Sequence, residues 1–92
     1  MNETPTPALL DSRRRRLLFR ANHRGTKETD LLVGGYVSAR IASLNAAELD
    51  ELDAIMELPD PELADWLTGR LPIPAAHPHA AMLHHMLTAA GQ

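Results

Sequence analysis

The strongest constraint on the fold is the spacing of apolar residues, which recur at three- and four-residue steps along most of the chain. This spacing is that of an α-helix, whereas a half-buried strand alternates apolar and polar residues. No strand-length alternating run of β-branched residues occurs. Cysteine is absent, which excludes a disulfide framework and a thiolate zinc site. The sequence therefore predicts an all-α single domain, a small bundle of about five helices.

Glycine, proline and asparagine residues separate the predicted helices from one another. We expect residues 1–9, which include two prolines, to form a disordered leader, and residues 10–92 to form the helical domain. Within that domain, residues 71–92 supply a stiff linker and the last helix. The expected helices run over about 12–22, 26–44, 46–57, 61–68 and from 76 or 78 to 90.

Polar residues at the expected helix starts support these boundaries. Asp11 or Ser12 can cap the first helix. Asn45 can cap the third helix, and Glu48 at the third helical position completes a capping box. Asp60, which a proline follows at the first helical position, is expected to cap the fourth helix.

Two adjacent glycines, Gly34 and Gly35, lie within the apolar pattern of the second helix. Each costs about 1 kcal/mol of helix stability relative to alanine. The pair either permits close packing against another helix or weakens the second helix locally, and both alternatives stay open.

Charge is distributed unevenly along the chain. The net charge is −3, yet seven of the nine basic residues lie between Arg13 and Lys27. The stretch from Ile41 to Gly69 holds eight acids and no base. Such polarity favours docking to a partner over a reaction pocket. No run of about 18 apolar residues occurs, so no membrane span is expected, and the sequence predicts a cytoplasmic, bacterial protein.

Other classes of site find little support in the sequence. No nucleophile is paired with a base, so an enzyme is not expected, and Trp66 is assigned to the core rather than to flavin stacking. The run Arg13–Arg16 is short and no base-reading helix follows it, which favours a solvated face or a partner surface over nucleic acid. No metal site is expected, because no carboxylate accompanies the four histidines of the last segment, His77, His79, His84 and His85.

The corner between the first two helices holds the most distinctive residues. Arg24 follows the first helix and Glu28 lies in the first turn of the second, where each contact with a helix dipole contributes about 0.3–1 kcal/mol. Gly25 permits a positive backbone angle and the close approach of another chain. These residues either serve the helix ends alone, or Arg24 also forks onto a carboxylate or phosphate of a partner.

Three segments carry a resemblance to a known family. They are Arg-Leu-Leu-Phe-Arg at 16–20, His-Arg-Gly-Thr-Lys-Glu-Thr-Asp-Leu-Leu at 23–32, and Leu-Pro-Asp-Pro-Glu-Leu-Ala-Asp-Trp-Leu at 58–67. Over about residues 14–69 the chain resembles the succinate dehydrogenase FAD-assembly factors, which comprise the bacterial SdhE proteins and their mitochondrial relatives.

The resemblance implies a function. Members of that family are small five-helix domains that bind the flavoprotein subunit of succinate dehydrogenase, and in some bacteria that of fumarate reductase. They promote covalent attachment of FAD to a histidine of that subunit. By this resemblance the chain is an assembly factor and not an enzyme. Because Trp66 is assigned to the core, we do not expect this chain alone to bind FAD tightly. The alternative is a generic small helical adaptor whose basic end binds another acidic protein or nucleic acid.

The resemblance also implies a set of partner-binding residues, centred on the family's Arg-Gly-x-x-Glu motif. Arg24, Gly25 and Glu28 carry over position by position. Arg24 is expected to fork onto a carboxylate or carbonyl of the partner, Glu28 to orient Arg24 or pair with a base of the partner, and Gly25 to allow close backbone approach. The predicted surface also includes Arg16, Arg20, His23, Lys27 and Asp30.

Overall fold

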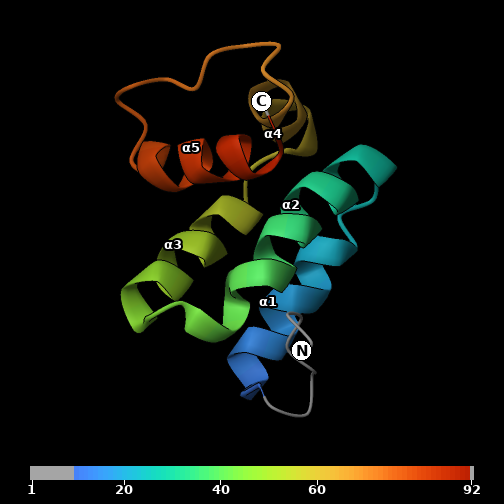
Figure 1. The fold of residues 1–92 in the computed structure, drawn as a ribbon, viewed down its shortest axis with the longest axis vertical. Helices are drawn as coiled ribbons and strands as arrows, with labels where there is room; N and C mark the ends of the chain where they lie inside the picture. Colours follow the sequence, from blue (N-terminus) through green and yellow to red (C-terminus); the bar gives the residue numbers. More distant parts are fainter. Residues whose placement is uncertain (1–9, 92) are drawn as a thin grey trace.

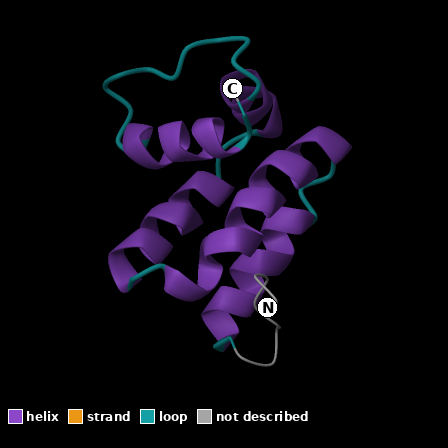
Figure 2. Ribbon diagram, viewed as in Figure 1, coloured by secondary structure: helices purple, strands orange, loops and turns teal. Residues whose placement is uncertain are grey.

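Five α-helices follow one another in the computed structural model, which describes residues 10–91 (Figure 1). Within these residues no segment forms a strand (Figure 2), so the predicted all-α class is confirmed. The leader predicted over residues 1–9 lies outside the described residues. In chain order the elements are α1 (Ser12–Asn22), α2 (Lys27–Arg40), the short 3₁₀ helix η2 (Ile41–Ser43), α3 (Ala46–Met56), α4 (Asp60–Leu67) and α5 (Ala80–Ala89).

The first two helices form an antiparallel hairpin that organises the rest of the fold (Figure 1). Helix α3 packs beside α1, whereas α4 and α5 pack on each other and on α2. A long connection, residues 68–79, runs between α4 and α5 (Figure 1). The corner between α1 and α2 lies next to the start of α4, where Arg24 contacts Asp60.

One apolar core is shared by all five helices. Leu18, Leu32 and Leu87 are only partly buried and pack at its edge. Trp66 is buried, as predicted. Burying a leucine- or isoleucine-sized side chain contributes about 1.5–3 kcal/mol. The side chains that are fully buried in this core include Leu17, Ala21, Val33, Val37, Ile41, Leu52, Ile55, Leu63, Leu67, Leu83 and Met86.

The local signals at the starts of α1 and α3 are confirmed. Asp11 is the N-cap of α1, and its carboxylate accepts the Arg14 N–H at 2.8 Å. This backbone hydrogen bond holds the pKa of Asp11 below its ordinary value. Asn45 and Glu48 form the predicted capping box, with bonds of 2.8 and 2.9 Å.

The prediction for the start of α4 is wrong. Pro59 is the N-cap of this helix and no side chain caps it. The carboxylate of Asp60 accepts a hydrogen bond from Arg24 instead, at 2.8 Å. A contact to a residue 36 positions away has therefore replaced the local cap.

Two other helix boundaries differ from expectation. Helix α2 ends at Arg40 rather than at residue 44, and the chain continues as the 3₁₀ helix η2. Arg14 binds two carbonyls of this segment: Nε donates to Ile41 O at 2.9 Å and Nη2 to Leu44 O at 2.5 Å. The last helix begins at Ala80, after a turn in which Ala80 N–H donates to His77 O. No helix among residues 10–91 is long and apolar enough to cross a bilayer.

The two adjacent glycines of α2 have different surroundings, and this resolves the alternatives left open above. A Cβ on Gly34 would overlap the side chain of Asn22 and lie 3.3 Å from Ala21 O, so Gly34 allows α1 and α2 to pack closely. A Cβ on Gly35 would meet nothing within 4 Å. Gly35 therefore has no packing role of this kind.

Candidate functional site

The chain reverses direction between α1 and α2 through four residues, His23 to Thr26. His23 ends α1, and its N–H donates to Arg20 O at 3.3 Å. Gly25 has φ +112°, a conformation that L-residues rarely adopt, so glycine is favoured here for conformational reasons. Thr26 caps α2 by accepting the N–H of Thr29 at 3.2 Å. Local signals thus place the reversal of the chain at this point.

Arg24 extends from the corner toward the connection between α3 and α4. Its Nε donates to Asp60 Oδ1 at 2.8 Å, Nη1 to Met56 O at 2.7 Å, and Nη2 to Leu58 O at 2.7 Å. The side chain is only 9% exposed. The Arg24 N–H also donates to the carboxylate of Asp30 at 2.5 Å. In this structure all three guanidinium nitrogens of Arg24 are bound within the chain, and the predicted fork onto a partner group stays a prediction.

Gly25 and Glu28 lie at the surface of the same corner. Gly25 is exposed, and the nearest atom to a hypothetical Cβ is Asp60 Oδ2 at 3.9 Å. The Glu28 carboxylate is 3.4 Å from Nη2 of Arg70, whose Nε is 3.1 Å from Asp65 Oδ1. Hydrogen bonds to Asp65 and then to Glu28 raise the pKa of Arg70 above its ordinary value. The corner thus presents a bare peptide beside an exposed ion pair.

Folding neutralises much of the basic cluster of α1. Arg13 lies 2.6 Å from Asp50 Oδ1. Arg20 lies 2.9 Å from Asp53 Oδ1 and 2.5 Å from Glu57 Oε2. Burial works against the charge of Arg20, but hydrogen bonds to the two carboxylates of α3 raise its pKa. The two oppositely charged stretches of the sequence therefore face each other across α1 and α3.

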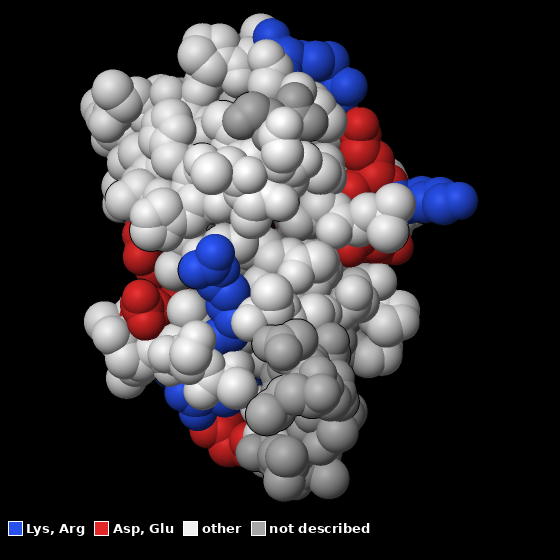
Figure 3. Space-filling view, in the orientation of Figure 1, with Lys and Arg blue, Asp and Glu red and all other residues white. Residues whose placement is uncertain are grey.

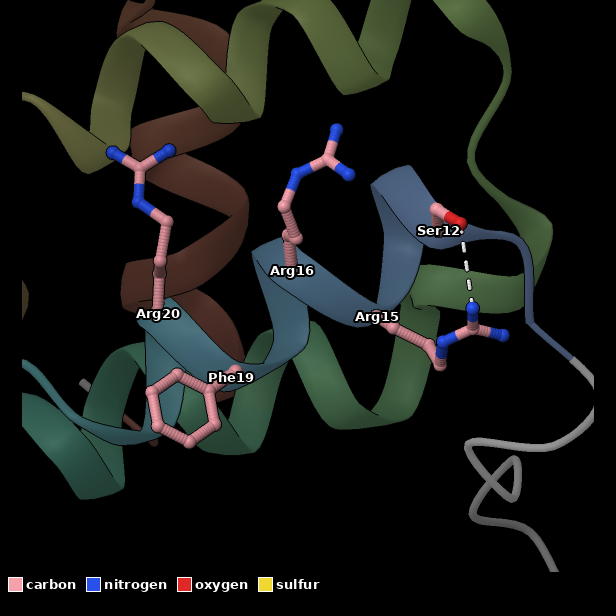
Figure 4. Close-up of a pocket in the computed structure, with 5 residues that line it drawn as sticks. All are labelled: Ser12, Arg15, Arg16, Phe19 and Arg20. Carbon is pink, nitrogen blue, oxygen red and sulfur yellow. Dashed lines mark hydrogen bonds between the residues drawn. The ribbon is translucent and has the colours of Figure 1, made fainter.

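Arg16 and Lys27 remain exposed, and no hydrogen bond or ion pair joins either side chain to another part of residues 10–91. In Figure 4, Arg16 and Arg20 are directed to the same side of α1, toward α3, where Arg13 and Arg20 engage the carboxylates. On the face shown in Figure 3, Asp and Glu side chains lie mainly toward the margins, whereas the part formed by α5 carries no Lys, Arg, Asp or Glu.

The sequence did not single out Phe19, yet it is the largest exposed apolar side chain near the corner, with 62% of its surface accessible. Its ring stacks on that of His23, with 4.0 Å between ring centroids and 16° between planes. His23 Nδ1 donates to Phe19 O at 2.8 Å, which fixes the orientation of the imidazole. Phe19 is two positions from buried Leu17, so helical spacing alone could have placed it outside the core.

The hollows near the corner are open and lie on both sides of Phe19. One, of about 560 Å³, is lined by Ser12, Arg15, Arg16, Phe19 and Arg20 (Figure 4). Another, of about 450 Å³, lies between the end of α1 and residues 56–60 and includes His23 and Arg24 in its lining. No buried side-chain nitrogen or oxygen of residues 10–91 lacks a hydrogen-bond partner.

The histidines of the last segment do not gather around one point. His77 contacts the edge of Trp66, His79 Nδ1 lies 3.3 Å from Glu51 Oε2, and His84 and His85 are exposed on α5. No group of three or more metal-ligating side chains occurs in the part of the chain that the structure describes.

The corner can act by recognition. It combines an exposed glycine, an exposed carboxylate, cations outside ion pairs and an exposed aromatic ring on a frame held by Arg24. Of the predicted residues, His23, Gly25, Lys27 and Glu28 are exposed here, and Arg16 lies two turns back on α1. Arg20, Arg24 and Asp30 serve contacts within the chain. Their contact with a partner stays a prediction.

Comparison with known proteins gives a consistent match. A family model described as "Flavinator of succinate dehydrogenase" matches residues 15–90. The FAD assembly factor SdhE of Acetobacter pasteurianus is 62% identical over 65 residues, which are 71% of this chain and 60% of that protein.

Mitochondrial proteins match as well. Succinate dehydrogenase assembly factor 2 of Mycosarcoma maydis is 41% identical over 78 residues, which are 80% of this chain and 33% of that protein. The protein of the same name in Saccharomyces cerevisiae is 36% identical over 59 residues, 64% of this chain and 36% of its own length. The chain thus spans between one third and about 60% of the length of these relatives.

Proposed function

Because the chain belongs to the family of flavinators of succinate dehydrogenase, we propose that it binds the flavoprotein subunit of that enzyme and promotes covalent attachment of FAD. The printed names of the relatives, FAD assembly factor and succinate dehydrogenase assembly factor, support this proposal. In this proposal the chain supplies no reacting group, and FAD is held by the partner.

The observation that carries the proposal is that, within the Arg-Gly-x-x-Glu corner, the arginine is bound inside the chain while the glycine and the glutamate are exposed. Arg24 binds Asp60 and two carbonyls and so ties the corner to the connection between α3 and α4. Gly25 and Glu28 are held at the surface of this tied unit. Arg24 acts as a positioning residue, and Gly25 and Glu28 are the groups that meet the partner. A pre-organised surface of this kind lowers the entropic cost of binding.

A binding protein can accelerate flavin attachment without doing chemistry. If it binds the attachment-competent conformer of the flavoprotein more tightly than other conformers, it raises the population of that conformer. The gain equals the ratio of the two affinities, so about a hundredfold preference corresponds to about 2.7 kcal/mol. The acceptor histidine, the flavin and the reacting groups then all belong to the flavoprotein.

The ion pairs of α1 favour a protein partner over nucleic acid. Arg13 and Arg20 are engaged by Asp50, Asp53 and Glu57 of α3, so few cations remain to neutralise phosphates. Residues 71–91 contain no lysine or arginine.

Co-expression tests the proposal directly. The flavoprotein subunit from the same organism is produced with and without this chain, and covalently retained flavin fluorescence is measured after denaturing electrophoresis. We expect fluorescence only, or far more strongly, when the chain is present. Gly25→Arg should abolish the gain, whereas Gly35→Arg, the same change on open α2 surface, should not. Equal fluorescence with and without the chain would refute the proposal.

The same experiment with the fumarate reductase flavoprotein asks whether a second client exists. Flavin attachment that depends on the chain in both flavoproteins would extend the proposal to two clients. If flavin attachment depends on the chain in only one of the two flavoproteins, that flavoprotein is the client.

A further inference from the structure

Phe19 and its neighbours on α1 form a second exposed feature, separate from Gly25 and Glu28. We define the α1 anchor as Phe19, His23, Arg15 and Arg16. We propose that the α1 anchor inserts the Phe19 ring into an apolar recess of the flavoprotein client whose rim is acidic. This inference rests on the proposed function, since it names the chemistry by which the same partner is held.

The first argument is the exposure of the aromatic ring. Phe19 is 62% exposed, although every residue of the apolar face of the same helix is buried or partly buried. An exposed phenylalanine contributes nothing to the core, and aromatic side chains are the typical anchors of protein interfaces. Hollows of about 560 and 360 Å³ flank the ring, so the surface beside it is open to a partner.

The second argument is that the ring is already held in place. It stacks on His23 at 4.0 Å between centroids, and the His23 imidazole is itself fixed by its bond to Phe19 O. An anchor that is ordered before binding loses less side-chain entropy when it enters a recess. Because His23 also borders the Arg24 corner, the α1 anchor is continuous with that corner.

The third argument concerns charge, and it selects the chemistry of the rim. Arg13 and Arg20 form ion pairs with the nearest carboxylates, those of Asp50, Asp53 and Glu57. Arg16 forms no ion pair within residues 10–91. Arg15 donates to Ser12 Oγ (Figure 4) and to Leu10 O, both neutral acceptors. Neither guanidinium beside the exposed ring therefore has a carboxylate partner within residues 10–91. Carboxylates around an apolar recess supply both complements.

Binding measurements with the full chain test the α1 anchor. The flavoprotein subunit, prepared without covalent flavin, is titrated by calorimetry with the wild-type chain and with Phe19→Ala, Arg16→Glu and Leu71→Ala. Leu71 is the matched control, because it is also an exposed large apolar residue, at 53%, but lies outside the α1 anchor. We expect Phe19→Ala to weaken binding about tenfold or more, and Leu71→Ala to leave it within about twofold.

Arg16→Glu separates charge from shape. Reversing this charge should weaken binding and also reduce the dependence of affinity on salt, since screened charge pairs contribute to it. Melting temperatures of all variants should match the wild type, because none of the substituted side chains is buried. Phe19→Ala binding as tightly as wild type, or Leu71→Ala weakening binding equally, would overturn the inference.

These outcomes are distinguishable from failure of the proposed function. If the wild-type chain binds the flavoprotein and raises its covalent flavin while Phe19→Ala behaves identically, the proposed function stands and the α1 anchor is wrong. If the wild-type chain does not bind the flavoprotein, both proposals fall. Wild-type binding to a DNA duplex that is tighter than to the flavoprotein, and lost with Arg16→Glu, would assign these cations to nucleic acid and overturn the inference.

Discussion

Nε of Arg24 lies 2.8 Å from Oδ1 of Asp60, and this contact fastens the corner between α1 and α2 to the first turn of α4. The same guanidinium binds the carbonyls of Met56 and Leu58. A motif arginine that would be expected to reach outward thus holds two loops together, and the shape of the corner depends on it.

Replacing Arg24 should therefore lower the stability of the folded chain directly, and affect binding only through the shape of the corner. Arg24→Ala leaves a partly buried carboxylate and two carbonyls without their donors, and we expect the free energy of unfolding to fall by about 3 kcal/mol. Urea denaturation followed by circular dichroism measures this change. The free energy of unfolding of Arg24→Lys should lie between those of the wild type and Arg24→Ala, because an ammonium group cannot reproduce the planar fork of the guanidinium.

Arg20→Ala is the matched control for that loss. Arg20 lies on α1 and, like Arg24, its guanidinium bonds groups of another segment, here two carboxylates of α3 and its flank, but its side chain is 40% exposed. We expect its removal to cost less than about 1 kcal/mol, since exposed ion pairs contribute little. Equal costs for the two alanine variants would contradict the view that Arg24 is a structural clasp.

Substitutions at Gly25 should destabilise the protein through backbone strain rather than through lack of space for a side chain. Its φ is +112°, and a Cβ there would approach no atom closer than 3.9 Å. Gly25→Ala is expected to lower the free energy of unfolding by about 1–3 kcal/mol through backbone strain. Gly25→Asn should cost less, because asparagine tolerates positive φ better than alanine does. Thermal unfolding of both variants checks this order, and an alanine variant as stable as the wild type would contradict it.

Features whose partners lie within a few residues were predictable from the sequence. The capping box of Asn45 and Glu48 spans three positions, and the corner at Gly25 needs only one glycine between two amphipathic helices. The apolar periodicity located the core of every helix for the same reason, because a helix places residues three and four apart on one face. These parts of the fold are local consequences of residue type.

Features whose partners are distant could not be predicted in this way. Asp60 has the position and chemistry of a helix cap, but its partner Arg24 lies 36 residues away. Likewise the pairing of Arg20 with Asp53 and Glu57 depends on how α3 packs beside α1, which decides which cations stay unpaired. The composition of the candidate site is therefore a property of the tertiary structure.

The two glycines of α2 should behave oppositely when replaced by alanine. Gly35→Ala is expected to stabilise the protein by up to about 1 kcal/mol, because it gains helix propensity and its Cβ would meet nothing within 4 Å. Gly34→Ala is expected to destabilise it, since the new Cβ displaces the Asn22 side chain from its bond to Leu18 O and presses on Ala21 O. Urea midpoints measure both changes.

The double variant Asn22→Ala/Gly34→Ala tests the cause. Removing the Asn22 amide takes away the nearest obstacle, so part of the loss should be recovered relative to the sum of the single variants. Strict additivity would show that the contact with Asn22 is not the source of the cost.

Glu28 and Arg70 offer a way to separate a contact within the chain from one with a partner. Their ion pair is 3.4 Å long and about half exposed on both sides, so Glu28→Ala and Arg70→Ala should each change the free energy of unfolding by less than about 1 kcal/mol. If Glu28 meets the flavoprotein, Glu28→Ala lowers covalent flavin in co-expression while Arg70→Ala does not. Equal loss with both variants would indicate that Glu28 acts through Arg70.

Tyr36 gives a pH-dependent signal that comes from one residue, because it is the single tyrosine of the chain. Burial raises the pKa of its phenol above the ordinary value of 10, although Arg40, 5.0 Å from the ring centroid at its guanidinium carbon, opposes the shift. The folded protein therefore keeps the phenol proton at a pH where the unfolded chain has released it.

Stability should consequently be unaffected by Tyr36 below about pH 10 and should fall as the pH rises beyond that value toward the pKa of the folded state. The sign follows because the folded state binds more protons than the unfolded state in that interval. Ultraviolet titration of the phenolate in native protein and in concentrated urea measures both midpoints. Tyr36→Phe should flatten the decline, whereas a native midpoint at or below the unfolded one would show that the ring is not buried as described.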